Sequence, residues 1–345
     1  MKKLIALLLA LVMVFCLVAC GAVDAPAADA PAADAPAADA PAADAPAADA
    51  PADDAPVADE GIGEIALVLQ RAEHGWMAAV TYYAEKHCKD LGLNYKVYLS
   101  DNVNEQAGQI EEAVTNGAKA IVLSAHNEEV SLACKKAVDE GVILISFDRV
   151  VDYLTAYIGG DNFGLGVAYG TFICENLGGE GIVALQSVPS VGAVSQERVD
   201  GFYSVANEYP GITVIEFATE GYQQEQGLKA AADLLTANPH IDAIASQDDE
   251  SSVGFLKAID DAGRTDIKYI SGCGGMQSYF HTIEEYGKGD LQLCTATYAP
   301  SMITEAIDLA VEALNGVEVA EKNIIPTNLV SADNVADFYD ENSPY

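Results

Sequence analysis

Residues 120–149 read AIVLSAHNEEVSLACKKAVDEGVILISFDR, and this stretch holds one full repeat of the pattern that decides the fold. An apolar run at 120–124 is followed by an amphipathic stretch at 128–140 and by a second apolar run at 142–147. Short apolar runs that alternate with helical periodicity are typical of parallel strands joined by helices. The stretch therefore predicts a strand–helix–strand unit, and it ends on two charged residues, Asp148-Arg149.

The same alternation continues on both sides of this unit. Further strands are expected at 65–69, 95–99, 181–186, 212–217, 243–246, 269–271 and 291–295. Further helices are expected at 75–91, 104–116, 162–177, 194–209, 223–238, 250–263, 276–286 and 301–314. The segment 61–345 is also longer than a chain that usually folds around a single hydrophobic core. The sequence therefore predicts an α/β protein with two parallel sheets in series.

The N-terminal region combines a positive charge at Met1-Lys2-Lys3 with an apolar stretch at 4–18. That stretch is too short to span a membrane as a helix, and it is typical of a secretory signal. It ends in Leu17-Val18-Ala19-Cys20-Gly21, which resembles the lipobox of bacterial lipoproteins. The resemblance implies that residues 1–19 are a signal peptide and that Cys20 is lipidated, which anchors the chain to the cell membrane on its extracytoplasmic side. An ordinary signal with an incidental cysteine is the alternative.

A low-complexity segment follows the signal. Residues 25–59 consist of seven tandem five-residue units, namely APAAD five times, then APADD and APVAD. A proline in every unit prevents a helix, and the side chains are too small to build a core. In polyproline geometry such a segment reaches on the order of 100 Å. We interpret residues 20–61 as a disordered tether between the lipidated Cys20 and the folded part.

The charge balance narrows the choice of partners. The chain carries 53 acidic and 17 basic residues, which gives a formal net charge of −36 at pH 7. A surface this acidic repels nucleic acid and anionic membranes. The expected partners are therefore a small molecule and a transporter, with the membrane reached through the lipid anchor alone.

The sequence carries no motif of the common enzyme classes. Its five histidines lack the HExxH spacing, and there is neither a G-x-S-x-G elbow nor a P-loop. The run Gly164–Gly170 misses a dinucleotide fingerprint by one residue and falls inside an expected helix. The cysteines after Cys20 lack metal-ligand spacing, and a Cys273–Cys294 disulfide is left open. We expect a binding protein without catalytic residues, cofactor or metal.

Ligands of parallel α/β sheets bind beyond the carboxyl ends of the strands. Glu73 and Trp76 follow the first expected strand, Asp148-Arg149 follows the fourth, and Asp248 follows the strand at 243–246. Carboxylates accept hydrogen bonds from hydroxyls, arginine donates in a fixed fork, and an aromatic face stacks on a sugar ring. These residue types indicate a site for a sugar.

Six motifs in a fixed order carry a family resemblance. They are Ile65-Ala-Leu-Val, Leu144-Ile-Ser-Phe-Asp148-Arg149, Gly159-Gly-Asp161-Asn162, Gln196-Glu-Arg198-Val-Asp-Gly-Phe202, Gln247-Asp-Asp249-Glu250 and Ser331-Ala-Asp-Asn-Val-Ala-Asp-Phe-Tyr. From about residue 62 to its end, the chain resembles the periplasmic-binding-protein family that includes ribose-, galactose- and galactofuranose-binding proteins.

The resemblance implies the type I fold of that family, in which two Rossmann-like lobes with parallel central sheets are joined by three hinge crossovers. The N-terminal lobe would combine residues 62–160 with 299–327, and the C-terminal lobe would combine 161–298 with 328–345. The implied function is capture of a monosaccharide between the lobes and delivery to the permease subunits of an ABC importer. The alternative is a sensor that presents a sugar or an autoinducer-like signal to a membrane receptor.

The resemblance also implies individual binding residues. Asp148 and Arg149 match the family's pair for ring hydroxyls, and Arg198 matches its arginine from the other lobe. The remaining implied binding residues are Glu73, Trp76, Tyr222, Asp248 and Tyr298. Two positions depart from the pattern, because Gly272–Gly275 stands where the family presents an aspartate and Tyr298 stands where ribose binders use a glutamine. We therefore expect a sugar other than ribose.

Several of these residues have a purely structural alternative. Asp148-Arg149 could form a surface ion pair, and Trp76 could pack in the core. Arg198 could pair with a neighbouring acid on its own helix. Asp249 could contact the sugar or cap the helix that follows it. His74 is expected at the rim of the site.

Overall fold

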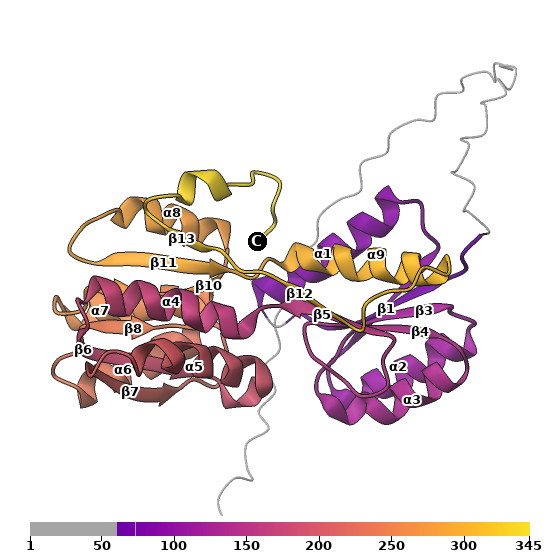
Figure 1. The fold of residues 1–345 in the computed structure, drawn as a ribbon, viewed down its shortest axis with the longest axis horizontal. Coiled ribbons are helices and arrows are strands. Elements are labelled where there is room, and N and C mark those ends of the chain that lie inside the picture. Colours follow the sequence, from indigo (N-terminus) through magenta and orange to yellow (C-terminus); the bar gives the residue numbers. More distant parts are fainter. Residues whose placement is uncertain (1–60, 73) are drawn as a thin grey trace, which may run out of the picture. The chain divides into compact units, whose positions relative to one another are not determined.

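The computed structural model describes residues 61–72 and 74–345, which form two sheets with helices on both faces (Figure 1). The predicted signal peptide, the lipidated Cys20, the repeat segment and Glu73 lie outside the described residues. Within the described part of the chain, no helix is long and apolar enough to cross a membrane.

The first sheet has six parallel strands in the order β12-β5-β4-β3-β1-β2. The strands are β1 (Ile65–Gln70), β2 (Tyr95–Ser100), β3 (Ala120–Ser124), β4 (Ile143–Phe147), β5 (Ala156–Gly160) and β12 (Lys322–Ile325). The helices are α1 (Gly75–Asp90), α2 (Val103–Thr115), α3 (Ser131–Asp139) and α9 (Ile303–Leu314). Helices α1 and α9 cover one face of the sheet, and α2 and α3 cover the other (Figure 1).

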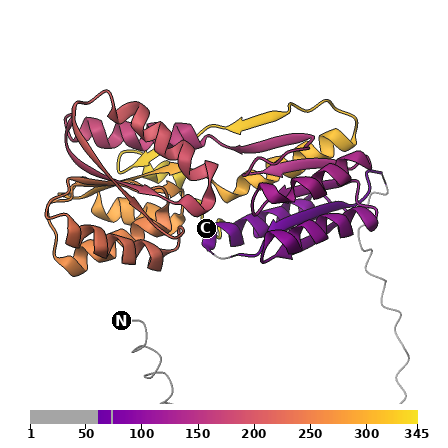
Figure 2. The same ribbon diagram turned by 90° about the horizontal axis from the view of Figure 1, so that it is seen from below.

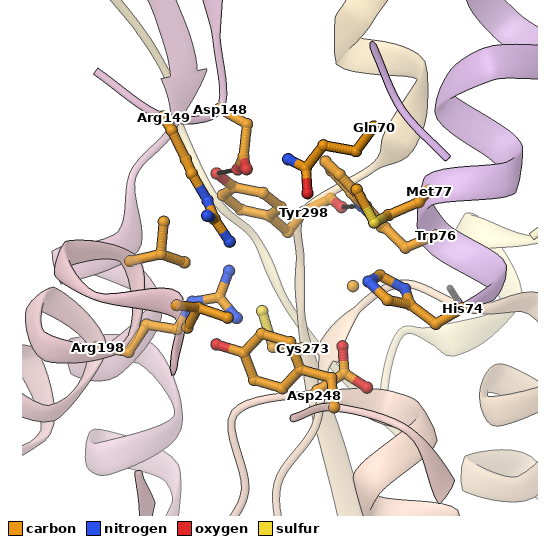
Figure 3. A pocket seen from close by; sticks show the side chains of 14 residues that line it. Gln70, His74, Trp76, Met77, Asp148, Arg149, Arg198, Asp248, Cys273 and Tyr298 are labelled. Atoms are coloured by element: carbon orange, nitrogen blue, oxygen red, sulfur yellow. Dashed lines mark hydrogen bonds between the residues drawn. The ribbon is translucent and has the colours of Figure 1, made fainter. Parts of the chain in front are cut away.

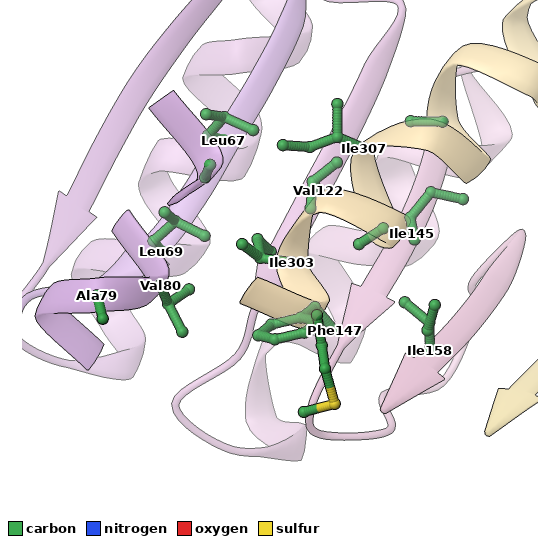
Figure 4. Close-up of a cluster of buried hydrophobic side chains, with 14 of the residues drawn as sticks. Leu67, Leu69, Ala79, Val80, Val122, Ile145, Phe147, Ile158, Ile303 and Ile307 are labelled. Carbon is green, nitrogen blue, oxygen red and sulfur yellow. The ribbon is translucent and has the colours of Figure 1, made fainter. Parts of the chain in front are cut away.

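Successive side chains of the central strands point to opposite faces, so each strand feeds two cores. In β1, Leu67 and Leu69 pack under α1 and α9, whereas Ala66 and Val68 pack under α2 and α3. Figure 4 shows the first of these cores, in which Phe147 at the end of β4 lies among the aliphatic side chains of α9 and the strands. The uninterrupted apolar run of each strand follows from this burial on both faces.

The second sheet has seven strands in the order β10-β11-β9-β8-β6-β7, with β13 antiparallel to β11. The strands are β6 (Glu180–Ser187), β7 (Gly211–Ala218), β8 (Ala243–Ala245), β9 (Tyr269–Ile270), β10 (Cys273–Gly274), β11 (Gln292–Thr297) and β13 (Leu329–Ser331). The helices are α4 (Asn162–Asn176), α5 (Ala193–Ala206), α6 (Gln224–Ala237), α7 (Asp249–Ala262) and α8 (Gln277–Tyr286). Helices α4 and α5 share one core with this sheet, and α6, α7 and α8 share the other.

The chain passes between the two sheets three times, as the type I fold requires. It crosses between β5 and α4, between β11 and α9, and between β12 and β13. Figure 2 shows the two sheets with their helices side by side and the crossing segments between them. The predicted α/β class with two parallel sheets is therefore confirmed.

The predicted strands and helices are all present, with ends that shift by a few residues, and short elements were missed. The helix predicted at 128–140 begins as a 3-10 turn, Glu128–Val130, before α3. Strand β5 was missed because its sequence AYIGG is short and ends in two glycines. Strand β12 was missed because it is an edge strand with alternating exposure, which a search for apolar runs does not detect.

The cysteines Cys88, Cys134, Cys174, Cys273 and Cys294 are buried and free. The disulfide left open for Cys273 and Cys294 is absent between these two described residues. The register of β10 on β11 places Ala296 opposite Cys273, so the two thiols are not cross-strand partners.

The glycines that imitate a dinucleotide motif have a packing role. A side chain on Gly166 of α4 would place its Cβ 2.2 Å from the carbonyl oxygen of Arg198 and 2.7 Å from the amide nitrogen of Phe202, both on α5. A Cβ on Gly201 of α5 would lie 2.1 Å from the carbonyl oxygen of Phe163. The two helices are in backbone contact here, which only glycine permits.

We predict that Gly166→Ala lowers the free energy of unfolding by about 2 kcal/mol, because its methyl group must separate α4 from α5. The matched control is Gly108→Ala on α2, where a Cβ meets nothing within 4 Å. Alanine there should raise stability by about 0.5–1 kcal/mol through its higher helix propensity. Urea unfolding of both variants measures the difference, and equal stabilities would contradict the packing argument.

Candidate functional site

A cavity of about 540 Å³, its open mouth included, lies where strand ends of the two sheets face each other. Its walls come from the end of β1, from the segments that follow β1, β4, β6, β7, β8 and β11, and from β10. The lining side chains and glycine are Gln70, His74, Trp76, Met77, Asp148, Arg149, Val191, Val194, Arg198, Tyr222, Asp248, Cys273, Gly274 and Tyr298. Figure 3 shows labelled polar and aromatic groups converging on this space from both sides.

Asp148 adopts a strained backbone conformation directly after β4. Its φ is 67°, in the left-handed region that costs a non-glycine residue roughly 1 kcal/mol. Its amide donates to the carbonyl of Ile158 at 3.0 Å, and its own carbonyl accepts from the hydroxyl of Tyr157 at 3.1 Å. Its carboxylate accepts from the hydroxyl of Tyr298 at 2.6 Å (Figure 3). These bonds hold the strained turn, and they pair the carboxylate with a phenol rather than with Arg149.

Trp76 is fixed in the wall by α1 and by the second crossover. Its indole lies parallel to the ring of Phe147, with centroids 6.0 Å apart, and tilted to the ring of Tyr298 at 5.8 Å. Its Nε1–H donates to the carbonyl of Tyr298 at 2.7 Å. The side chain is 8% exposed, and it lines the cavity. Trp76 therefore both packs in the core and borders the site.

Two arginines enter the cavity from opposite sheets. Arg149 donates from Nη1 to the carbonyl of His126, and its Nε is buried without a hydrogen-bond partner in the described structure. Arg198 is 4% exposed and donates from Nε to Asn162 at 2.9 Å and from Nη1 to the carbonyl of Gln247 at 2.8 Å. Figure 3 shows the two guanidinium groups pointing toward each other. Like charges that converge in this way favour a ligand rich in hydrogen-bond acceptors.

The guanidinium of Arg198 also contacts two aromatic rings. Its central carbon lies 4.9 Å from the centroid of Tyr298 and 5.7 Å from that of Tyr222. The guanidinium of Arg198 forms no ion pair with Glu197 or Asp200 among the described residues, because it donates to Asn162 and to the carbonyl of Gln247. Helix α5 thus delivers Arg198 into the site, and buried hydrogen bonds hold it there.

Asp248 closes the cavity on the α7 side and caps that helix. Its Oδ1 accepts from the amides of Glu250 at 2.8 Å and Ser251 at 3.3 Å. Burial, together with the nearby Asp249 and Glu250, raises the pKa of Asp248 well above its usual range. The helix starts at Asp249, so the capping role considered for Asp249 belongs to Asp248.

Asp249 lies behind the cavity wall and fixes the segment that follows β10. Its carboxylate accepts from the hydroxyl of Thr295 at 2.6 Å and from the amides of Gly275 and Met276 at 2.8 Å each. Burial raises its pKa to about 6, although these hydrogen bonds act in the opposite direction. A Cβ on Gly272 would lie 2.2 Å from Asp249 Oδ1. The buried carboxylate of Asp249 therefore occupies the space of a side chain at Gly272, the first residue of the run that departs from the family pattern.

His74 lines the cavity as an uncharged side chain. Burial lowers its pKa to about 4, with Asp148 acting to raise it and Arg149 to lower it. The prediction for His74 was a rim position, and the residue lies in the wall of the cavity, at the N-cap of α1.

The structure brings together the side chains that the sequence singled out. Seven of them line this one cavity: Trp76, Asp148, Arg149, Arg198, Tyr222, Asp248 and Tyr298. Glu73 lies outside the described residues. Among those described, no group of three or more acidic, histidine or cysteine side chains is arranged to hold a metal ion.

Sequence reasoning missed other wall residues. Gln70 is the last residue of β1, so the strand-end rule could have found it. Val191 and Val194 follow β6 and carry no polar signal. Cys273 and Gly274 form β10, a two-residue strand that pairs with β11 and whose sequence gives no strand-end signal.

We predict that His74 makes the protein less stable toward acid. In the folded state the ring takes up its proton near pH 4, but near pH 6.5 once unfolded. Between these values the unfolded state binds more protons, so the free energy of unfolding falls as the pH falls. Between pH 7 and pH 4.5, the wild type should lose roughly 1–2 kcal/mol more than His74→Gln in urea unfolding. The same loss in both proteins would contradict a buried, neutral His74.

Known relatives are similar to this chain over more than half of its length. The ribose import binding protein RbsB of Salmonella typhimurium is 24% identical over 271 residues, which cover 77% of this chain and 90% of that protein. The D-apiose import binding protein of Actinobacillus succinogenes is 27% identical over 221 residues, which cover 59% of this chain and 68% of that protein.

Solved structures share the fold. An ABC transporter periplasmic solute-binding protein of Actinobacillus succinogenes with bound D-allose superposes with a TM-score of 0.73 at 22% identity, covering 80% of this chain and 100% of that one. A solute-binding protein of Bacillus halodurans with bound myo-inositol gives a TM-score of 0.75 at 19% identity, covering 84% and 100%. Both likenesses extend over the two sheets.

The family itself is shown by a match that extends over most of the folded chain. Residues 65–318 match the model of the periplasmic binding protein domain. That range runs from β1 of the first sheet to the turn after α9, and it includes the residues that line the cavity. The chain belongs to the periplasmic binding protein domain family.

Proposed function

We propose that this chain is an extracytoplasmic solute-binding lipoprotein that captures a monosaccharide in the cavity and delivers it to an ABC importer. The observation that carries the proposal is the convergence of hydrogen-bonding groups from both sheets on one cavity. Asp148 and Arg149 come from the first sheet, and Arg198 and Asp248 come from the second. A polyhydroxylated ring can satisfy all of them at once.

The chemistry of the wall suits a sugar. The carboxylate of Asp148 uses one oxygen for Tyr298 and keeps lone pairs for a ligand hydroxyl. The guanidinium of Arg149 lines the cavity and offers N–H donors to the oxygens of a sugar. Trp76 and Met77 offer apolar contact beside these polar groups. Each hydroxyl that matches its partner adds affinity, and a missing hydroxyl leaves a buried group unpaired.

The relatives support the same substrate class. Their names and bound ligands include ribose, D-apiose, D-allose and myo-inositol. Each of these compounds is a small molecule with several hydroxyl groups and a single ring. They are binding proteins rather than enzymes. The relatives with import in their names favour delivery to a transporter over the sensor alternative.

Closure of two lobes over the ligand follows from this proposal. We propose that residues 62–160 and 299–327 form one lobe and that 161–298 and 328–345 form the other. Because binding groups lie on both, a closed form binds the ligand more tightly than an open one, and the ligand shifts the population toward closure.

We predict that a monosaccharide changes the fluorescence of Trp76, the single tryptophan of the chain, in a saturable manner. A panel of D-ribose, D-galactose, D-allose, D-apiose and myo-inositol tests this on residues 61–345. Arg149→Ala should abolish the response, because it removes a donor from the cavity. Arg71→Ala is the matched control, since Arg71 is exposed and pairs with Asp101 outside the cavity. Silence across the panel, with no thermal shift, would contradict the monosaccharide assignment.

We predict further that Cys20 carries the lipid anchor. The full chain expressed in a bacterial host should partition into the detergent phase of a Triton X-114 extraction, and Cys20→Ser should move it to the aqueous phase. Cys16→Ser is the control, because that cysteine lies inside the predicted signal peptide. Aqueous partitioning of the unaltered chain would contradict lipidation.

A further inference from the structure

A hydrogen bond links the two sides of the site away from the cavity itself. The amide of Gly75, the first residue of α1, donates to Oε1 of Glu250 on α7 at 2.8 Å. Helix α1 packs on the first sheet and α7 on the second, so the bond joins elements that belong to different sheets.

This bond supplies an acceptor to the N-terminus of α1 and a donor to the partly buried carboxylate of Glu250. The N-cap residue of α1, His74, provides no side-chain cap, so the first amides of the helix require another acceptor. A carboxylate at a helix N-terminus is favoured by the helix dipole. Burial raises the pKa of Glu250, and the amide of Gly75 acts in the opposite direction. The contact therefore offsets part of the desolvation of a carboxylate that faces the other side of the cleft.

Both residues of the Gly75–Glu250 bond are close in sequence to residues that line the cavity. Gly75 lies between His74 and Trp76, which line the cavity. Glu250 follows Asp248, another wall residue, whose Oδ1 accepts from the Glu250 amide at 2.8 Å. In Figure 3, His74 and Asp248 approach the same end of the cavity from opposite elements. Loss of the bond between Gly75 and Glu250 would therefore affect wall residues on both sides of the cavity. Gly75 is covalently linked to its neighbours in one wall, and Glu250 is hydrogen-bonded to Asp248 in the other.

Gly75 leaves room for the carboxylate. A Cβ at this position would lie 2.9 Å from Oε1 of Glu250 and 3.6 Å from the ring of Tyr345. The backbone of Gly75 does not have a positive φ, so alanine can adopt its conformation. A methyl group here would displace the flexible end of Glu250 and leave the start of α1 intact.

We propose that Glu250 is a positioning residue, which docks on the N-terminus of α1 from the opposite lobe and holds the two walls of the cavity together over the ligand. The residue lies outside the cavity wall and acts through His74, Trp76 and Asp248. The effect on affinity rests on the proposed sugar-binding function, whereas the contact itself can be tested without a ligand.

The affinity test uses a double-mutant cycle with the panel sugar that binds in the Trp76 titration. Glu250→Ala and Gly75→Ala should each weaken binding by roughly threefold to tenfold, as expected for a partly exposed charge-assisted bond. The double variant should be no weaker than either single variant, because both changes remove one interaction. Glu250→Gln retains an acceptor without the charge and should fall between Glu250→Ala and the wild type.

The matched control is Glu225→Ala, which removes an exposed carboxylate from the first turn of α6. It should bind the sugar as the wild type does. Additive losses from Gly75→Ala and Glu250→Ala, or equal affinities of Glu250→Ala and Glu225→Ala, would overturn the proposal. So would a fall in the melting temperature of ligand-free Glu250→Ala well beyond that of the control, since it would assign Glu250 to fold stability.

Hydrogen exchange tests whether Glu250 accepts from the amide of Gly75 without requiring a ligand. The amide of Gly75 should exchange several-fold faster in Glu250→Ala than in the wild type or in Glu225→Ala. Equal exchange in all three proteins, both free and saturated with a panel sugar that binds, would overturn the contact. If no panel sugar binds while the exchange difference is present, the monosaccharide assignment fails and the docking role of Glu250 stands.

Discussion

The hydrogen bond from the Tyr298 hydroxyl to the Asp148 carboxylate joins positions 150 residues apart, and the cavity is arranged around it. Tyr298 lies at the second crossover, and its ring occupies the space beside Gly160 at the first crossover, where a Cβ would lie 2.3 Å from the ring. Its carbonyl holds the indole of Trp76, and its ring faces the guanidinium of Arg198. One tyrosine thus contacts the carboxylate, the tryptophan and an arginine of the site.

The wall formed by the second sheet is held by a connected polar network. Gln186 accepts from the hydroxyl of Ser246 and from the amide of Gln247, and Ser252 donates to the carbonyl of Ser271. Buried groups that satisfy one another in this way define a single arrangement, because any displacement leaves one of them unpaired. Asp248 and Arg198 are therefore presented to the cavity in fixed positions before a ligand arrives.

The two departures from the family pattern, at Gly272–Gly275 and at Tyr298, each change the contacts around the cavity. In the run Gly272–Gly275, the buried carboxylate of Asp249 takes the space that a side chain on Gly272 would need, and Cys273 and Gly274 line the cavity without a carboxylate. The phenol of Tyr298 donates to one lone pair of the Asp148 carboxylate, to which a ligand hydroxyl could otherwise donate. Together they alter which hydroxyls the wall can pair with. This change is the physical basis for expecting a ligand other than ribose.

The sequence by itself determined the strand–helix alternation, because burial on both faces of a parallel sheet demands uninterrupted apolar runs. It also located Asp148, Arg149 and Asp248, since ligand-facing residues of such sheets follow the strands. Only the tertiary structure decided that Asp148 pairs with Tyr298, that Asp249 lies behind the wall and that Glu250 meets Gly75. These pairings join residues 46–175 positions apart, and their geometry depends on how the strands and crossovers pack rather than on any local periodicity.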